Sequence, residues 1–225
     1  MTSPCDLKDF VMRECEVIDT HIHGLTDCSS KQVVDIGYGD GRLVAYFLSK
    51  GFYVKGVDND CSSEAQLRAN LQAAAIPEDN LQCECTDIKN YSFKNGENAV
   101  VILSHVLHFI HANEAQLVLA QAAQSVALNG MILIRAHHKS HPFKNQVEFK
   151  KVFKHFFSRS EIEQHFEKNF RLLHRTVIFG VPPHPEKTQN TSEQQVNPQV
   201  KYDFGTLSEE WCDVSSVRLT SGQMF

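Results

Sequence analysis

The stretch Lys31-Gln32-Val33-Val34-Asp35-Ile36-Gly37-Tyr38-Gly39-Asp40-Gly41 decides the fold, because a short apolar run stops abruptly in three alternating glycines. The β-branched residues before the glycines are typical of a buried strand. The following segment, 41–50, places its apolar residues at helical spacing and ends at Gly51. A strand, a glycine turn and a helix in this order predict the first unit of a parallel α/β sheet.

The same unit recurs along the chain. Residues 99–103 form an uninterrupted apolar run, which is typical of a central parallel strand covered on both faces. Strands that alternate with helices in this way predict an α/β fold with a doubly wound, mostly parallel sheet. The further strands are expected at 53–57, 81–85, 131–134 and 170–179, and the helices at 64–75 and 113–128. Another helix is expected through 161–166, with Ser158 or Ser160 as its cap.

The regular alternation sets the predicted domain boundaries. A chain of 225 residues can build one medium-sized core. Residues 1–30 precede the alternation and are expected to form a cap or lid, and 31–225 the main domain. Within it, residues 181–199 are rich in Pro, Gln, Asn, Ser and Thr, which predicts a flexible loop. Residues 214–219 recover a strand-like pattern.

Composition excludes several classes of protein. The net charge of −5 disfavours a nucleic-acid partner, because a phosphate-binding surface normally needs an excess of Lys and Arg. No apolar run approaches the roughly 20 residues that span a bilayer, and no signal-peptide core is present. Seven irregularly spaced cysteines predict a reduced, cytoplasmic protein. Cys83 and Cys85 are expected to be buried structural thiols.

Acidic residues follow the predicted strands where a ligand would lie. In doubly wound sheets, ligands bind at the carboxyl ends of the strands, beside a helix N-terminus. Asp58 ends the second strand, where a carboxylate can accept hydrogen bonds from both hydroxyls of a ribose. Asp87 ends the third strand and is placed to contact an adenine edge.

These motifs resemble those of the class I S-adenosylmethionine-dependent methyltransferases. Asp35-x-Gly37-x-Gly39-x-Gly41 is similar to motif I of that family, Asp58 to its ribose-binding acid, and Thr86-Asp87-Ile88 to its adenine-contacting segment. Residues 103–110, Leu-Ser-His-Val-Leu-His-Phe-Ile, resemble the stretch after the fourth strand in small-molecule methyltransferases, including the tellurite-resistance type. The similarity covers about residues 31–179.

The resemblance implies a fold, a cofactor and a set of binding residues. The family's fold is Rossmann-like, with seven strands of which the last is antiparallel, and 214–224 would supply that last strand. The implied cofactor is S-adenosylmethionine. Its implied contacts are Asp35, Gly37, Tyr38, Gly39, Gly41, Asp58, Asn59, Thr86, Asp87, Ile88 and Ser104.

Two features bear on that assignment. Nicotinamide dehydrogenases share the fold, but their Gly-x-Gly-x-x-Gly fingerprint has its third glycine one position later than Gly41. Tyr38 departs from the family, which usually has a small residue or Cys at this position. A bulky ring there would either cover the methionine part of the cofactor or obstruct the site.

Histidines that follow the fourth and fifth strands are candidates for the chemistry. A sulfonium cofactor is already a strong electrophile, so the protein mainly has to align the acceptor. A base is needed only if the acceptor must lose a proton, and histidine is suited to that task. His105 and His108 are the predicted catalytic residues, since the resemblance puts their loop beside the transferable methyl. The other candidates are His137, His138 and His141, and a surface or supporting role is open for each of them. Arg135 could bind an acidic acceptor or pair with a carboxylate.

The acceptor class follows partly from a missing motif. Residues 104–107, Ser-His-Val-Leu, stand where amino-methylating members of the family carry Asn/Asp-Pro-Pro-Tyr/Phe. A small-molecule acceptor is therefore expected, with a protein acceptor or a partner subunit still open. One alternative is a non-catalytic, methyltransferase-like binding module.

A second alternative is a metal-dependent hydrolase. Asp19-x-His21-x-His23 resembles the first metal-binding strand of amidohydrolases, and two histidines at i and i+2 on a strand share one face. That fold needs a complete barrel of about 250 residues with ligands on later strands. No metal site is predicted.

Overall fold

A computed structural model of the chain describes Cys15, 18–22, Leu25, Cys28, 30–166, 169–177 and 211–218. The predicted flexible loop at 181–199 lies outside these residues, and so does most of the predicted cap at 1–30. In the described part of the chain, no helix combines the length and the apolar character that crossing a membrane requires.

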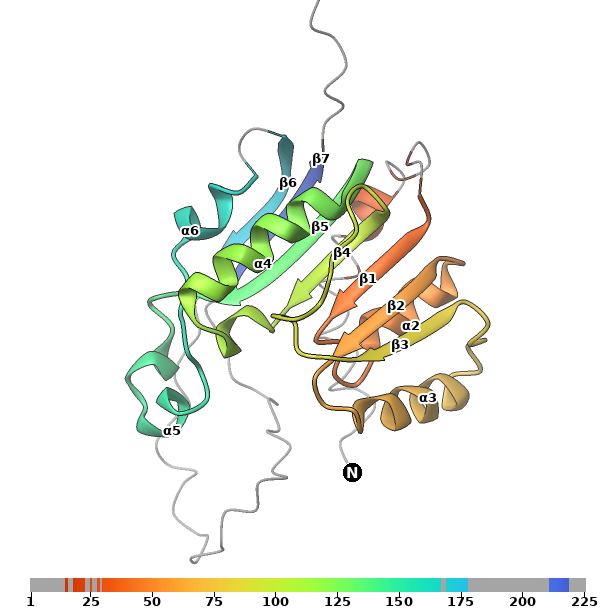
Figure 1. Cartoon of the computed structure of the whole chain (residues 1–225), viewed down its shortest axis with the longest axis horizontal. Helices are drawn as coiled ribbons and strands as arrows, with labels where there is room; N and C mark the ends of the chain where they lie inside the picture. Colours follow the sequence, from red (N-terminus) through yellow and green to blue (C-terminus); the bar gives the residue numbers. More distant parts are fainter. Residues whose placement is uncertain are drawn as a thin grey trace, which may run out of the picture.

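A seven-stranded sheet forms the centre of the molecule (Figure 1). Its order is β3-β2-β1-β4-β5-β7-β6, and the first five strands in this order are paired in parallel. β7 pairs antiparallel with both β5 and β6. The bounds are β1 Gln32–Ile36, β2 Tyr53–Asp58, β3 Leu81–Cys85, β4 Asn98–Ser104, β5 Val126–His137, β6 Phe170–Val177 and β7 Trp211–Arg218.

Helices cover both faces of the sheet, so the predicted doubly wound α/β fold is confirmed. Successive residues of a strand point to opposite faces. Val33 of β1 accordingly belongs to the apolar core beneath α2 and α3, whereas Val34 belongs to the core beneath α4 and α6. The helices are α2 Arg42–Ser49, α3 Ser63–Ala73, α4 Ala112–Ser125, α5 Val147–Lys150 and α6 Arg159–Glu163, with short 3₁₀ turns at η2 Leu107–Phe109 and η3 Pro142–Asn145.

The helix expected at 113–128 ends three residues early, at Ser125. β5 begins directly afterwards, with a break in its register against β4. Asn129 has a left-handed φ of 60°, and a Cβ on Gly130 would lie 2.8 Å from the carbonyl oxygen of Ala99. The backbone approaches β4 too closely at this point for a helix to continue.

The amidohydrolase-like motif is not a strand in the structure. Residues 18–22 are helical, so Asp19 and His21 point about 200° apart around the axis rather than to one face. Asp19 accepts hydrogen bonds from Tyr46 Oη of α2 at 2.6 Å and from Nζ of Lys50, directly after α2, at 3.0 Å. His23 lies outside the described residues, among which no group of His, Cys, Asp or Glu side chains could hold a metal ion. The strand on which the hydrolase alternative depends is therefore wrong for residues 18–22.

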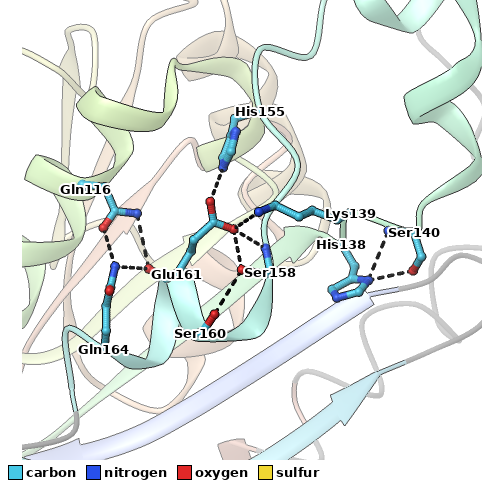
Figure 2. A network of polar contacts seen from close by, with 9 residues as sticks. All are labelled: Gln116, His138, Lys139, Ser140, His155, Ser158, Ser160, Glu161 and Gln164. Carbon is cyan, nitrogen blue, oxygen red and sulfur yellow. Dashed lines mark hydrogen bonds and ion pairs between the residues drawn. The ribbon is translucent and has the colours of Figure 1, made fainter.

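A polar network centred on Glu161 fastens the segment after β5 to α6 (Figure 2). Its carboxylate accepts hydrogen bonds from the Ser158 backbone N–H at 2.6 Å, from Lys139 Nζ at 2.8 Å and from His155 Nε2 at 3.1 Å. Burial raises the pKa of this carboxyl, but the hydrogen bonds from Lys139 and Ser158 outweigh burial and lower the pKa to about 2. The network is therefore strongest with an ionised carboxylate.

Replacing this carboxylate should destabilise the fold in a pH-dependent way. Because the folded pKa of about 2 lies below the ordinary 4.5, ionised Glu161 stabilises the fold above about pH 4.5, and this contribution is lost as the pH falls toward 2. We expect Glu161→Gln to lower the free energy of unfolding by about 1–3 kcal/mol at pH 7. Urea unfolding at pH 7 and at pH 3 measures both effects.

Glu163→Gln is the matched control. Glu163 forms a surface ion pair with Arg159 one helical turn away, which is worth only about 0.3–0.5 kcal/mol. A similar loss in both variants would contradict the central role of Glu161.

Candidate cofactor and acceptor site

The carboxyl ends of β1, β2, β3 and β4 meet at one edge of the sheet and bring the predicted cofactor residues together. In the strand registers Ile36 faces Val57, Asp58 faces Cys85, and Asp35 faces Ile102. Asp35 is buried, Ser104 is half-buried at the end of β4, and Asn59 is exposed beyond β2. The edge therefore exposes backbone and polar groups above a closed apolar core.

The three glycines of the loop have left-handed backbone conformations, with φ of 73°, 53° and 80° at Gly37, Gly39 and Gly41. A Cβ at Gly37 would lie 2.8 Å from the side chain of Val106, and one at Gly41 would overlap the side chain of Leu67. These two contacts bring the loop against the segment after β4 and against α3. Glycine is needed at both positions for space as well as for dihedral freedom.

Asp58 connects the glycine loop to β2. Its Oδ2 accepts a hydrogen bond from Gly39 N–H and its Oδ1 from Asp60 N–H, both at 2.9 Å. A carboxylate offers about four lone-pair positions, so further donors can still bind. The loop is held on its other side by Gly37 N–H, which donates to the carbonyl of Val57 at 2.6 Å.

The segment after β3 lies directly beside this carboxylate. Thr86 N–H donates to the backbone carbonyl of Asp58 at 2.9 Å. Asp87 turns the chain by accepting from Lys89 N–H at 2.9 Å, and Ile88 is buried. The residues predicted to contact ribose and adenine are thus adjacent in space.

The side chain of Tyr38 lies in the core, which neither sequence-based alternative anticipated. Only 7% of the residue is exposed, and the ring covers Gly56 of β2 so closely that a Cβ there would lie 2.9 Å from it. Burial raises the pKa of its hydroxyl, as does the neighbouring Cys83. The missing side chain at position 56 creates the room that this bulky ring occupies.

The prediction of reduced, buried thiols is wrong for Cys85. Its sulfur is bonded to that of Cys61, and both residues are exposed. Cys83 is half-buried and carries a free thiol that packs with the core around Tyr38. Cys61 was not singled out in the sequence, although its place three residues after β2 was the available signal.

Four histidine rings gather where β4 and β5 end. The ring centroids of His108 and His137 are 4.0 Å apart, those of His137 and His141 4.4 Å, and those of His105 and His137 6.2 Å. Phe153 packs against both His108 and His137. The two predicted catalytic histidines thus share one cluster with His137 and His141.

Two other candidates differ in their surroundings. His138 lies outside the cluster and contacts Ser140 (Figure 2). Arg135 is buried on β5, and its carbonyl accepts a hydrogen bond from His105 N–H at 3.0 Å.

The four clustered imidazoles are neutral at physiological pH. Burial lowers the pKa of His105 and His108 well below the ordinary value, and the nearby Arg135 lowers that of His105 further. Burial likewise lowers the pKa of His137 to about 3 and that of His141 to about 4. A neutral imidazole can accept a hydrogen bond from an acceptor hydroxyl or amine. His105 also has a left-handed φ of 58°, a strained conformation for a residue with a Cβ.

Comparisons with known proteins agree with this geometry. Residues 33–130 match the family model described as a methyltransferase domain. The resemblance to the class I S-adenosylmethionine-dependent methyltransferases is therefore confirmed over residues 33–130. The matched segment includes the glycine loop, Asp58 and residues 86–88.

Solved structures share the fold at low sequence identity. TehB from Haemophilus influenzae is 15% identical with a TM-score of 0.65, and the match covers 90% of this chain but 61% of TehB. Magnesium protoporphyrin IX methyltransferase from Synechocystis PCC 6803, solved with bound SAH, is also 15% identical, with a TM-score of 0.63 and coverage of 95% and 84%. A Haloferax volcanii complex that contains the Trm112 methyltransferase activator matches at 14% identity and a TM-score of 0.56, with coverage of 97% and 99%. No curated protein sequence matches this chain.

The packing of Tyr38 on Gly56 gives a direct test of the site's architecture. Gly56→Ala should lower the free energy of unfolding by about 1–3 kcal/mol, because the new Cβ overlaps the Tyr38 ring. The double variant Gly56→Ala/Tyr38→Leu should recover part of that loss. Thermal unfolding of the unchanged protein, of Gly56→Ala, of Tyr38→Leu and of the double variant measures the coupling.

Gly51→Ala is the control for the loss of a glycine. Unlike Gly56, Gly51 has a positive φ of 80°, and a Cβ there meets nothing within 4 Å, so its alanine variant reports the backbone cost without a clash. An additive double variant would contradict the proposed contact between the Tyr38 ring and position 56.

Proposed function

We propose that this chain transfers a methyl group from S-adenosylmethionine to a small-molecule acceptor. The observation that supports it best is the Asp58 carboxylate, which hydrogen-bonds the glycine loop while its own backbone carbonyl binds Thr86 at the end of β3. One residue thereby sets the spacing of three segments that would surround a nucleoside.

Each part of the cofactor has residues suited to it. Asp58, with Asn59 beside it, would accept the ribose hydroxyls, and Thr86-Asp87-Ile88 would flank the adenine. Gly37, Gly39 and Gly41 let the backbone approach the ligand, with the backbone of Tyr38 between them. Asp35 and Ser104, at the ends of β1 and β4, would lie toward the charged methionine end.

The acceptor would lie over the histidine cluster. Bound S-adenosylmethionine supplies an electrophilic methyl carbon, so alignment of the acceptor can provide much of the rate. His105 and His108 would accept a hydrogen bond from the acceptor's O–H or N–H and orient its lone pair. Neutral imidazoles suit that role, because protonated rings would repel the sulfonium.

A small molecule is favoured by the aromatic surroundings of this cluster, in which Phe153 packs against His108 and His137. Among the structural relatives, magnesium protoporphyrin IX methyltransferase is named for such a substrate. A non-catalytic role as a partner subunit is the second candidate, supported by the relative solved with an activator protein. The cap at 1–30, the catalytic domain at 31–225 and the cytoplasmic location stay predictions.

Removal of the Asp58 carboxylate should abolish tight cofactor binding. Hydrogen bonds to a charged group are worth about 1.5–3 kcal/mol, so we expect Asp58→Ala to raise the Kd for S-adenosylhomocysteine by at least ~10-fold. Isothermal titration calorimetry measures this change. Asp79→Ala, at an exposed site away from the loop, is the control.

Absence of binding by the unchanged protein at millimolar ligand would overturn the proposed function. Equal affinity in Asp58→Ala would overturn the pocket assigned to the cofactor.

Replacing His105 should separate catalysis from binding. With an acceptor found in a metabolite panel, we expect His105→Gln to lower the rate of S-adenosylhomocysteine formation by ~10²-fold, since the group that orients the acceptor is lost. The Kd for the cofactor should stay within ~2-fold, because His105 would contact the acceptor only. His138→Gln, outside the cluster, should keep the full rate.

An unchanged rate in His105→Gln would contradict its catalytic role. Tight cofactor binding by the unchanged protein without product from any acceptor would instead favour the partner-subunit candidate.

A further inference from the structure

The disulfide between Cys61 and Cys85 lies at the proposed nucleoside pocket. Cys85 is the last residue of β3 and faces Asp58 in the strand register. Cys61 stands three residues beyond Asp58, in the loop that leads to α3, and its Cα lies 5.1 Å from that of Cys85. The bond therefore links the chain segments at the carboxyl ends of β2 and β3.

This bond joins the two walls that would enclose the nucleoside. Asp58 and Asn59 form the ribose side, and Thr86-Asp87-Ile88, directly after Cys85, form the adenine side. Asp60, directly before Cys61, donates its N–H to Asp58 Oδ1 at 2.9 Å. Movement of Cys61 would thus act on the conformation of the ribose-binding carboxylate.

Solvent access distinguishes this pair from Cys15, Cys28 and Cys83, which are all half-buried. Cys61 and Cys85 are exposed, whereas Cys83, two residues earlier on the same strand, is half-buried beside Tyr38. Exposed disulfides are the ones that exchange readily with small thiols. Cys61 and Cys85 can therefore undergo thiol–disulfide exchange, and the exchange would change the conformation of the pocket.

We propose that Cys61 and Cys85 form a reversible oxidation site whose disulfide strengthens cofactor binding. The inference rests on the proposed function, because its readout is the affinity for the cofactor. In the oxidised state the loop at 59–62 is fixed against β3 before the ligand arrives, so less conformational freedom is lost on binding. In the reduced state the loop has to become ordered when the ligand binds, and this entropic cost lowers the affinity.

The exchange needs a small disulfide such as oxidised glutathione. One cysteine thiolate attacks one sulfur of oxidised glutathione. That glutathione stays bonded to the protein as a mixed disulfide, and the other leaves as a thiolate. The second cysteine thiolate then attacks the protein sulfur of that mixed disulfide and releases the second glutathione. Two protein thiols become one disulfide, and one oxidised glutathione takes up two electrons and two protons to become two reduced glutathione molecules.

Linkage makes the effect reciprocal. If the disulfide tightens cofactor binding by some factor, bound cofactor must stabilise the disulfide against reduction by the same factor. The reduced-to-oxidised glutathione ratio at half-oxidation should therefore rise when ligand is bound.

The test titrates S-adenosylhomocysteine into the whole chain in two states, one kept in oxidised and one in reduced glutathione. We expect the reduced protein to bind at least ~5-fold more weakly. The Cys61→Ser/Cys85→Ser variant should bind like the reduced protein in both buffers. Cys83→Ser should respond to the buffers as the unchanged chain does. Thiol labelling followed by mass spectrometry confirms which cysteines are paired.

The outcomes separate this inference from the proposed function. Binding in both states with equal affinity, or tighter binding in the reduced state, would overturn the oxidation site and leave the methyltransferase proposal standing. A redox response that persists in Cys61→Ser/Cys85→Ser would also overturn it. Absence of binding in both states would overturn both proposals. Because the main comparison uses the unchanged chain in two buffers, it holds even if a variant fails to fold.

Discussion

The site depends on the bond between the Gly39 N–H and the Asp58 carboxylate. A glycine loop is the most entropically costly part of such a fold, because glycine loses more conformational freedom on folding than any other residue. Asp58 offsets that cost by binding the loop through a charged acceptor while β2 holds it in register beside β1. Thr86 attaches β3 to the same residue through its backbone. The glycine loop, Asp58 and the end of β3 are therefore connected by hydrogen bonds into one edge of the sheet.

A different principle builds the neighbouring acceptor region. There the polar groups are imidazoles held neutral by burial, so the surface next to a positively charged sulfonium would carry little charge of its own. The segment that covers these rings contains Phe153 and is fixed at its far end by the ionised Glu161. The carboxylate of Glu161 anchors the far end of this segment, and the positive charge of Arg135 next to His105 helps to keep that imidazole neutral.

Local patterns predicted most of the fold, and contacts distant in sequence account for what they missed. The run before Gly37 and the run at 99–103 predicted central strands, because nearly all of their residues are apolar and are buried on both faces of the sheet. Asp58 and Asp87 could be placed at one edge because parallel strands all end there. The position of the Tyr38 ring could not be predicted, since it depends on Gly56 of the next strand. The Cys61–Cys85 bond and the gathering of His137 and His141 with His108 likewise depend on strand register and ring packing, which no single segment encodes. The early end of α4 follows from the close approach of Gly130 to β4.

The contact between Tyr38 and Gly56 has a consequence for the history of this sequence. A large ring at one position and an empty side chain at the other fill a single volume, so neither can change freely alone. Across relatives of this chain, the two positions should therefore vary as a pair: wherever the loop carries a small residue, the second strand is free to carry a larger one. Tyr38 would then mark a lineage in which a side chain of the glycine loop fills the core next to β2. The loop backbone that faces the ligand would be unchanged.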